Sequence, residues 1–238
     1  MMKMMILAPR RAGMTHEEFR RYVTEVHGPL VRSVPEVANA IRHYHYNFPV
    51  PATHDSLFQH PPASHLDIVT QGWFDSREAQ LENMAQPRYL ALVRPDEGRF
   101  ADAARAVMHY TQERVIHDGP AGLRRLFYFR RRRAGISREQ MQAAWHARFG
   151  RRLAALTGFE HVVSRYVQNH VMPESDHPDG THEKYFDLID EIHLRDGLDI
   201  GQLAGNLREL ADLRAVESQW LDVQRTRHLH TETVLNIP

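Results

Sequence analysis

Residues 10–28 read RRAGMTHEEFRRYVTEVHG, and residues 132–150 read RRAGISREQMQAAWHARFG. The two stretches lie 122 positions apart and share an arginine pair, an alanine, two glycines and a glutamate. The correspondence continues in three further pairs: Tyr44 with Tyr166, Asn47 with Asn169, and, at an offset of 120, Asp67 with Asp187. A repeat of this length is too long for a solenoid, and it predicts a duplicated domain. We expect the first copy to span residues 1–118 and the second residues 119–238.

The composition is that of an ordinary globular protein, with 42% hydrophobic and 25% charged residues in a chain of 238. Its 30 basic and 30 acidic side chains cancel, so net charge gives no support to a nucleic-acid partner. The chain has no cysteine, which excludes disulfides, thiolate metal sites and a cysteine nucleophile. No stretch has the pattern of a signal peptide or a membrane span, and we expect a cytoplasmic protein without a membrane partner.

Both halves show the same order of elements, β-α-β-β-α-β, which is that of a ferredoxin-like unit. The expected strands are residues 3–8, 40–48, 67–74 and 107–116 in the first half and 126–130, 162–170, 187–194 and 228–235 in the second. A capping box opens the first helix of each half, Thr15 with Glu18 and Ser137 with Gln140. On the first helix the apolar residues predict one buried stripe: Phe19, Tyr22, Val23, Val26 and Leu30. Because such a sheet has helices on one face only, we expect the two halves to cover each other as a pseudo-symmetric dimer.

The first copy resembles the EthD family in three segments: Gly13-Met14-Thr15, Glu18-Phe19-Arg20-Arg21-Tyr22 and Val26-His27-Gly28-Pro29-Leu30. The strand Arg165–His170 of the second copy resembles the same family. EthD proteins belong to the dimeric α+β barrel superfamily, so the resemblance implies tandem ferredoxin-like repeats that form an intramolecular dimeric α+β barrel. For activity it implies a range, because that superfamily includes cofactor-free monooxygenases, lactone isomerases, polyketide cyclases and haem enzymes. EthD proteins also often carry a general description as oxidoreductases.

The family motif is divided between the two copies. The tryptophan that the family has at Val23 is present only in the second copy, as Trp145, whereas the helix histidine is present only in the first, as His27. Phe149 stands at the position of that histidine in the second copy. This division predicts that the two pockets no longer do the same work, with one working site in the first copy.

His27 is the leading candidate for a catalytic residue. It lies at the edge of the expected stripe, and an apolar counterpart at its position indicates that it faces the interior. A partly buried imidazole there would have a lowered pKa and could serve as general acid or base. The resemblance adds that lactone isomerases and polyketide cyclases use a histidine at a matching place. The alternative is a packed or helix-capping histidine without a chemical role.

The second strand contributes most of the expected substrate-binding residues. Alternation places His43, His45 and Asn47 on one face and Tyr44 and Tyr46 on the other. His43 and His45 with His109 could also hold a metal, but no carboxylate has convincing spacing, and we expect none. The set expected to bind substrate is His43, His45, Tyr46, Asn47, Trp73 and His109. The floor of a pocket for a flat ligand could be formed by aromatic residues that could also simply be core: Trp73, Phe74, Tyr44, Tyr46 and Tyr89. Asn47 and Asn169 occur in both copies, which suits a structural role at a strand end as well as a catalytic one.

Several other polar residues are expected to be solvated. In the second copy Arg148 and Arg152 replace Val26 and Leu30, which indicates a helix end that faces solvent. The run 130–133 occupies a turn, and we interpret it as a solvated turn rather than a nucleic-acid patch. The loop histidines are expected to be exposed, with a lid over the first pocket as the weaker alternative: His54, His60 and His65.

Two functional hypotheses follow. The first is a cofactor-independent enzyme that oxidises, isomerises or dehydrates a small apolar or aromatic oxygenated compound in a degradation or secondary-metabolism pathway. The second is a non-catalytic ligand-binding or auxiliary protein of a monooxygenase system. Haem binding is a third possibility, which rests on the superfamily and on the 17 histidines. We expect no cofactor, a small ligand as partner, and either a monomer that is a pseudo-dimer or a homodimer.

Overall fold

The computed structural model describes residues 1–51, 57–58, 60–175, 185–205 and 207–237, and these form two compact units. Unit 1 contains Met1–Pro49, Ser64–Gln112 and Thr233–Pro238, and unit 2 contains Val50–Ala63 and Glu113–Glu232. Each unit therefore includes a short segment from the other half of the sequence. Loop residue His54, which is predicted to be exposed, lies outside the described residues.

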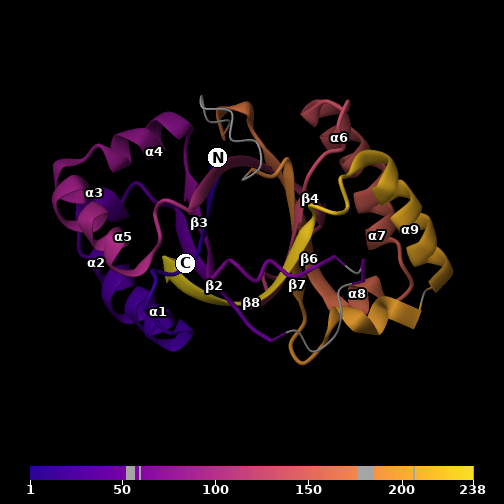
Figure 1. The fold of residues 1–238 in the computed structure, drawn as a ribbon, viewed down its shortest axis with the longest axis horizontal. Helices are drawn as coiled ribbons and strands as arrows, with labels where there is room; N and C mark the ends of the chain where they lie inside the picture. The colour runs from indigo at the N-terminus through magenta and orange to yellow at the C-terminus, as the bar shows by residue number, and fades with distance from the viewer. Residues whose placement is uncertain (52–56, 59, 176–184, 206, 238) are drawn as a thin grey trace. The chain divides into compact units, whose positions relative to one another are not determined.

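Unit 1 is an antiparallel sheet with helices on one face (Figure 1). Its elements are β1 (Met2–Ala8), α1 (His16–Tyr22), η1 (Val23–His27), α2 (Gly28–Arg32), α3 (Pro35–Ala38), β2 (His43–Pro49), β3 (Ile68–Phe74), α4 (Arg77–Met84), η2 (Tyr89–Val93), α5 (Arg94–Phe100) and β4 (Val107–His117). β1 lies between β3 and β4, and β2 pairs with the other edge of β3. The second helical stretch is interrupted between α4 and η2, beside Pro87.

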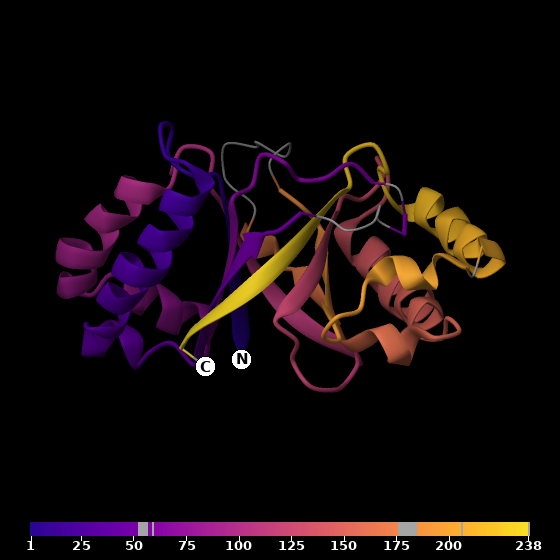
Figure 2. The same cartoon turned by 90° about the horizontal axis from the view of Figure 1, so that it is seen from below.

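Unit 2 repeats this plan, and Figure 2 shows its helices on one face of its sheet. Its elements are β5 (Arg124–Arg130), α6 (Arg138–Ala144), η3 (Trp145–Gly150), α7 (Arg151–Ala154), α8 (Phe159–Val162), β6 (Val163–Val171), η4 (Pro173–Ser175), β7 (Leu188–Leu194), η6 (Ile200–Gly205), α9 (Leu207–Trp220) and β8 (Arg227–Ile237). β5 lies between β7 and β8, and β6 pairs with the other edge of β7.

The strand order is β1-β3-β2-β8-β5-β7-β6-β4, a closed antiparallel barrel. The long strands β4 and β8 each contribute residues to both units. The predicted α+β class and barrel of ferredoxin-like halves are therefore confirmed. The second strand of the first half begins later than expected, at His43, because α3 and a turn closed by the Ile41 amide on the Ala38 carbonyl occupy the preceding residues.

Both predicted capping boxes are present. The Thr15 hydroxyl accepts from the Glu18 amide at 3.2 Å, and the Glu18 carboxylate accepts from the Thr15 amide at 2.8 Å. Ser137 and Gln140 make the same reciprocal pair at 3.2 and 3.0 Å. These contacts satisfy amides that a helix start leaves without partners, and so they fix where each helix begins.

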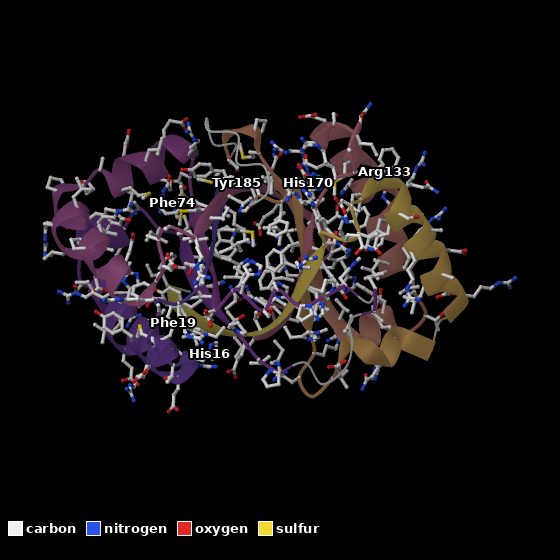
Figure 3. All side chains as sticks on the ribbon, viewed as in Figure 1. His16, Phe19, Phe74, Arg133, His170 and Tyr185 are labelled. Carbon is white, nitrogen blue, oxygen red and sulfur yellow. The ribbon has the colours of Figure 1, made fainter. Side chains whose placement is uncertain are left out.

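The predicted apolar stripe on the first helix is wrong at Val26, which is 45% exposed. The reason is that Val23–His27 form a π-helical turn, whose i to i+5 hydrogen bonds wind more widely than an α-helix. Residues four apart then keep facing the sheet, and the buried positions become Phe19, Val23, His27 and Val31. Phe19, labelled in Figure 3, packs 5.9 Å from Phe100 between ring centroids. The turn therefore moves His27 from the edge of the buried face to its centre.

The glycine that follows this turn in each copy has a steric reason. A Cβ on Gly28 would lie 2.8 Å from the Asn236 side-chain oxygen, and one on Gly150 would lie 2.6 Å from the Gln168 side-chain nitrogen. In both units the wide turn brings the helix backbone against a polar side chain of the sheet, and a glycine allows that approach.

Candidate functional site

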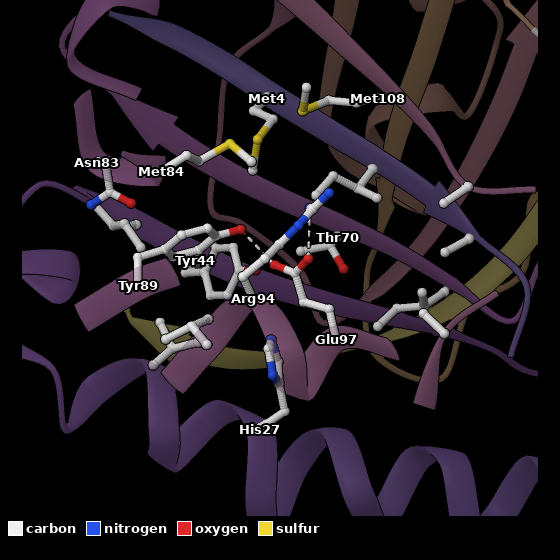
Figure 4. A pocket seen from close by; sticks show the side chains of 18 of the residues that line it. Met4, His27, Tyr44, Thr70, Asn83, Met84, Tyr89, Arg94, Glu97 and Met108 are labelled. Atoms are coloured by element: carbon white, nitrogen blue, oxygen red, sulfur yellow. Dashed lines mark hydrogen bonds and ion pairs between the residues drawn. The ribbon is translucent and has the colours of Figure 1, made fainter. Parts of the chain in front are cut away.

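Unit 1 contains a cavity of about 300 Å³ between its helices and the helix-facing side of its sheet (Figure 4). Most of its wall is apolar, from residues that include Met4, Ile6, Val31, Val37, Ile41, Ile68, Phe74, Val93, Phe100 and Met108. A smaller set of polar side chains reaches it: His27, Tyr44, Tyr46, Thr70, Gln80, Asn83, Tyr89, Arg94 and Glu97. An apolar cavity with a few convergent polar groups is the usual form of a small-molecule site.

His27 is the best-placed group for chemistry. Its side chain is 4% exposed, and its Nδ1 lies 3.0 Å from Oδ2 of Asp96, which is equally buried. Because a carboxylate only accepts hydrogen bonds, this contact places the ring proton on Nδ1 in the neutral imidazole. Nε2 then carries a lone pair and has no hydrogen-bond partner among the described residues. Figure 4 shows the ring rising from the helix toward Tyr44 and Glu97.

Asp96 is held by more than His27. The Tyr22 hydroxyl donates to Asp96 Oδ1 at 2.6 Å, and the Arg99 guanidinium lies 3.7 Å from the same oxygen. These contacts fix the carboxylate and offset the cost of burying its charge. Burial lowers the pKa of His27, and the hydrogen bond to Asp96 opposes that shift. The pair therefore provides an oriented imidazole that is neutral at physiological pH.

A second polar group lies on α5 and η2. The Tyr89 hydroxyl donates to Glu97 Oε1 at 2.6 Å, and Arg94 donates to Oε2 at 2.9 Å (Figure 4). Burial, followed by the charge of Glu97, raises the pKa of Tyr89. The same two causes raise the pKa of Tyr44. Both phenols are therefore neutral hydrogen-bond donors near neutral pH.

The two π-helical turns of unit 1 each position one side chain of these two polar groups. His27 is the last residue of η1, and Tyr89 is the first residue of η2. π-helical turns occur often at functional sites, because they displace one side chain from the regular helical register. Tyr46 on β2 completes this part of the wall, with its ring centroid 6.5 Å from that of His27.

The structure brings only part of the predicted site together. His27 and Tyr46 line the cavity, and so do three of the residues expected to floor a pocket: Phe74, Tyr44 and Tyr89. The other predicted substrate-binding residues are on the opposite face of the sheet and do not line it: His43, His45, Asn47, Trp73 and His109. The alternation predicted for the second strand is thus confirmed, and it separates the two sets.

On that opposite face the residues contact one another. The rings of His45 and Trp73 are 4.8 Å apart, and the ring of His43 meets Trp73 edge-on at 5.9 Å. Asn47 donates to the Val69 carbonyl at 2.8 Å and accepts from the Thr233 hydroxyl at 2.7 Å. Asn169 donates to the Ile189 carbonyl in the same manner at 3.1 Å. The two equivalent asparagines therefore tie neighbouring strands together.

In unit 2 the positions of the cavity are filled. Phe149, the counterpart of His27, stacks on Trp145 with ring centroids 3.8 Å apart. At the offset of 120, Asp96 corresponds to Val216, so both members of the His–Asp pair are apolar in the second copy. Phe58 contributes a further ring, 5.4 Å from Phe149. The second copy lacks both members of the pair and has a packed core in their place.

The expectation of a solvated turn is wrong for Arg130, which is 0% exposed. Its guanidinium contacts Asp190 at 2.9 Å and pairs with Glu217, and it lies 4.4 Å from the ring centroid of Tyr128. Arg130 corresponds to Ala8 of the cavity wall, so a long charged side chain fills space that is open in unit 1. Burial became possible because two carboxylates far apart in the sequence meet it.

The loop histidines differ from one another. His65 is exposed as expected, whereas the expectation is wrong for His60, which is 6% exposed and lies 2.7 Å from Glu217 Oε1. Its segment belongs to unit 2 and packs there beside Phe58. The helix end with Arg148 and Arg152 faces solvent, as predicted. Arg133, in the turn after β5, is exposed as well (Figure 3).

Sequence reasoning did not find Asp96, Glu97 or Arg94. Asp96 is 69 residues from His27, and only the packing of α5 against η1 joins them. One signal was present: the internal comparison pairs His27 with Phe149 and Asp96 with Val216, so both polar residues disappear together. Among the described residues there is no group of three side chains suited to a metal ion, and no helix there is long and apolar enough to cross a membrane.

Part of unit 1 matches a known protein family. The profile of the EthD domain matches residues 11–104, the part of unit 1 that carries His27 and Asp96. A conidial pigment biosynthesis dehydratase, EthD, of Metarhizium robertsii is 35% identical over 114 residues, which cover 75% of that protein and 43% of this chain. The chain belongs to the EthD family.

Two further proteins that are similar to this chain are also described as dehydratases. The dehydratase aurZ of Gibberella zeae is 30% identical over 122 residues, covering 78% of that protein and 48% of this chain. The dehydratase ustZ of Ustilaginoidea virens is 32% identical over 108 residues, covering 76% of that protein and 43% of this chain.

Solved structures match almost the whole EthD chain at low identity. An anthrone oxidase-like protein matches with a TM-score of 0.58 and 9% identity, over 98% of this chain and 91% of that one. A putative chlorite dismutase matches with a TM-score of 0.56 and 10% identity, over 99% and 96%. At such identities the likeness concerns the fold alone.

Proposed function

We propose that the cavity of unit 1 is an active site that eliminates water from a small, flat, oxygenated compound of secondary metabolism, with His27 as the base. The observation that carries the proposal is the His27–Asp96 pair, which leaves Nε2 as a free acceptor at an apolar cavity. The description of three relatives as dehydratases supports the reaction class.

The chemistry needs a ketone with a hydroxyl group on its β carbon. Nε2 of His27 takes a proton from the α carbon, and Asp96 stabilises the imidazolium that forms. The electrons of the broken C–H bond form the C=C bond as the C–O bond breaks. The imidazolium then returns its proton to the departing hydroxide, so that one water molecule leaves and the histidine is regenerated.

The phenols of the cavity supply the electrostatic part. Negative charge develops on the ketone oxygen while the α proton leaves, and a fixed neutral donor there stabilises it. Tyr44 and Tyr46 suit this role because burial raises the pKa of each, which keeps both protonated. The apolar wall excludes bulk water and strengthens these hydrogen bonds. No step of this reaction uses the residues on the opposite face of the sheet.

A model substrate tests the proposal: 3-hydroxy-1-tetralone, which yields 1-naphthol when it loses water, so that product is followed by fluorescence. We expect the wild type to accelerate this reaction and His27→Gln to reduce the rate to the uncatalysed level. His16→Gln is the matched control, because His16 is on the same helical segment with its side chain 41% exposed. Equal acceleration of the reaction by wild type and His27→Gln would contradict the proposal.

Ligand binding without turnover is the second candidate, and the loss of the polar pair in unit 2 favours it, because one copy already packs as a scaffold. The same experiment separates the two. Tight binding of 1-naphthol without any acceleration of water loss would support the binding protein.

A further inference from the structure

We infer that Glu97 makes the cavity of unit 1 selective for neutral ligands that carry a hydroxyl group, and that it excludes carboxylates. This inference rests on the proposed function in one respect, since it takes this cavity as the substrate site. It concerns which ligand enters, and it does not depend on the reaction that follows.

The charged side chains of the wall are the starting point. Two of the residues that line the cavity are formally charged at neutral pH, Arg94 and Glu97, and they pair with each other at 2.9 Å. The side chain of Arg94 is 57% exposed, and that of Glu97 is 30% exposed. The carboxylate is therefore the more inward of the two charges, and the guanidinium is already engaged by it.

The free hydrogen-bonding capacity of Glu97 is that of an acceptor. A carboxylate offers about four lone-pair sites, and the described contacts use one on each oxygen, from Tyr89 and from Arg94. The remaining sites can accept a proton from a ligand hydroxyl. They cannot pair with a ligand carboxylate, which has no proton to donate.

At the other end of the polar part of the cavity wall, His27 also favours a ligand that donates a hydrogen bond. His27 presents Nε2 as an acceptor, and Asp96 lies directly behind it. Burial lowers the pKa of His27 and raises that of Tyr89, and the charge of Glu97 acts upward on both pKa values, which places that charge within electrostatic reach of both ends. A ligand carboxylate would thus lie beside Glu97 in the apolar cavity, with the charge of Asp96 behind His27, and repulsion there is poorly screened.

Arg94 provides the competing arrangement. If its guanidinium left Glu97 and turned to the ligand, a carboxylate would be the preferred group, because arginine binds carboxylates with two parallel hydrogen bonds. The two arrangements predict opposite orders of affinity for a matched pair of ligands.

The test is calorimetric titration of the full chain at pH 7.5 with 1-naphthol, which is neutral, and 1-naphthoic acid, which is anionic. We expect wild type to bind 1-naphthol at least tenfold more tightly. We expect Glu97→Gln to reduce the ratio to threefold or less, mainly by tightening the binding of the acid. Glu82→Gln is the control, because it removes the same charge from an exposed position of α4 outside the cavity and should leave the ratio unchanged.

Four results would overturn the inference: equal affinities in wild type, preference for the acid, an unchanged ratio in Glu97→Gln, or no binding of either compound. Preference for the acid that disappears in Arg94→Gln would establish the competing arrangement. The ligands do not react, so selectivity without water loss would leave this inference standing while the proposed function fails. Water loss without selectivity would do the reverse.

Discussion

His27 and Asp96 lie on helical segments 69 residues apart, and Nδ1 of the histidine is 3.0 Å from Oδ2 of the carboxylate. One contact orients the imidazole, fixes its proton on Nδ1 and directs the lone pair of Nε2 to the cavity. Their counterparts in unit 2, Phe149 and Val216, are both buried and apolar. The polar pair thus distinguishes the two copies of an otherwise repeated fold.

Asp96→Asn should lower kcat for water loss by about 10²- to 10³-fold while the chain stays folded, because an amide does not stabilise the imidazolium. Asp102→Asn is the control, since its carboxylate pairs with Arg105 on the surface. Initial rates with 3-hydroxy-1-tetralone and a circular dichroism spectrum measure both effects. An Asp96→Asn chain with wild-type kcat would show that the carboxylate has no part in the reaction.

The rate should depend on pH through the neutral form of His27. Burial lowers the pKa of this histidine, so activity should persist below the usual histidine value near 6.5 and fall only at lower pH. Asp96 raises that pKa, so Asp96→Asn should move the acid limb to still lower pH. The profile of kcat/KM for both proteins gives the two midpoints. A wild-type midpoint above 6.5, or a shift to higher pH in Asp96→Asn, contradicts this assignment.

Placing a histidine in unit 2 should not create a second site. In the double variant His27→Gln with Phe149→His, the new imidazole would have Val216 where Asp96 stands, and Arg130 and Trp145 already fill the surrounding space. We expect activity no higher than that of His27→Gln alone, and a lower unfolding temperature because a stacked ring is lost. Recovery of turnover in the double variant would show that unit 2 retains a usable cavity.

Stability should fall in mild acid because of one buried histidine, His230, and one partly buried histidine, His170. Burial lowers the pKa of His170 and of His230 to about 4 in each case. The unfolded chain therefore takes up these protons first, so the stabilisation is complete above pH 6.5 and is lost as the pH falls toward 4. Each histidine should cost on the order of 3 kcal/mol over that interval.

Urea unfolding at pH 7.5 and pH 4.5 measures this loss. His230→Gln should reduce the difference between the two pH values by on the order of 2 kcal/mol. His117→Gln is the comparison, since that histidine is only partly buried. A pH dependence identical to wild type in His230→Gln would mean that this residue is not the source.

The fold follows from sequence features that act locally or repeat. The offset near 120, the two capping boxes and the alternation of the second strand each specify a structure without reference to distant residues. His27 could be identified from its place near the apolar stripe, from its phenylalanine counterpart and from the resemblance to the EthD motif. Its position at the centre of the buried face could not be predicted, because a 3.6-residue period does not describe the π-helical turn of η1.

The parts that could not be predicted depend on partners distant in the chain. Arg130 is buried because Asp190 and Glu217, which are 60 and 87 residues away, neutralise it. The predicted substrate-binding residues are divided between the two faces of the sheet. Tyr46 and Asn47, for example, are neighbours in sequence, but Tyr46 faces the cavity and Asn47 faces the opposite side. A strand pattern assigns residues to two faces, but only the packing of the helices shows which face borders a cavity.

The most direct measurement of proton abstraction by His27 is hydrogen–deuterium exchange at the α carbon of 6-hydroxy-1-tetralone in D₂O, followed by proton NMR. This compound carries the ketone and a hydroxyl group but has no group to eliminate, so exchange reports the first step alone. The account predicts that wild type and His16→Gln accelerate loss of the α-proton signal, whereas His27→Gln leaves it at the uncatalysed rate. Exchange at equal rates in wild type and His27→Gln would contradict the assignment of His27 as the base.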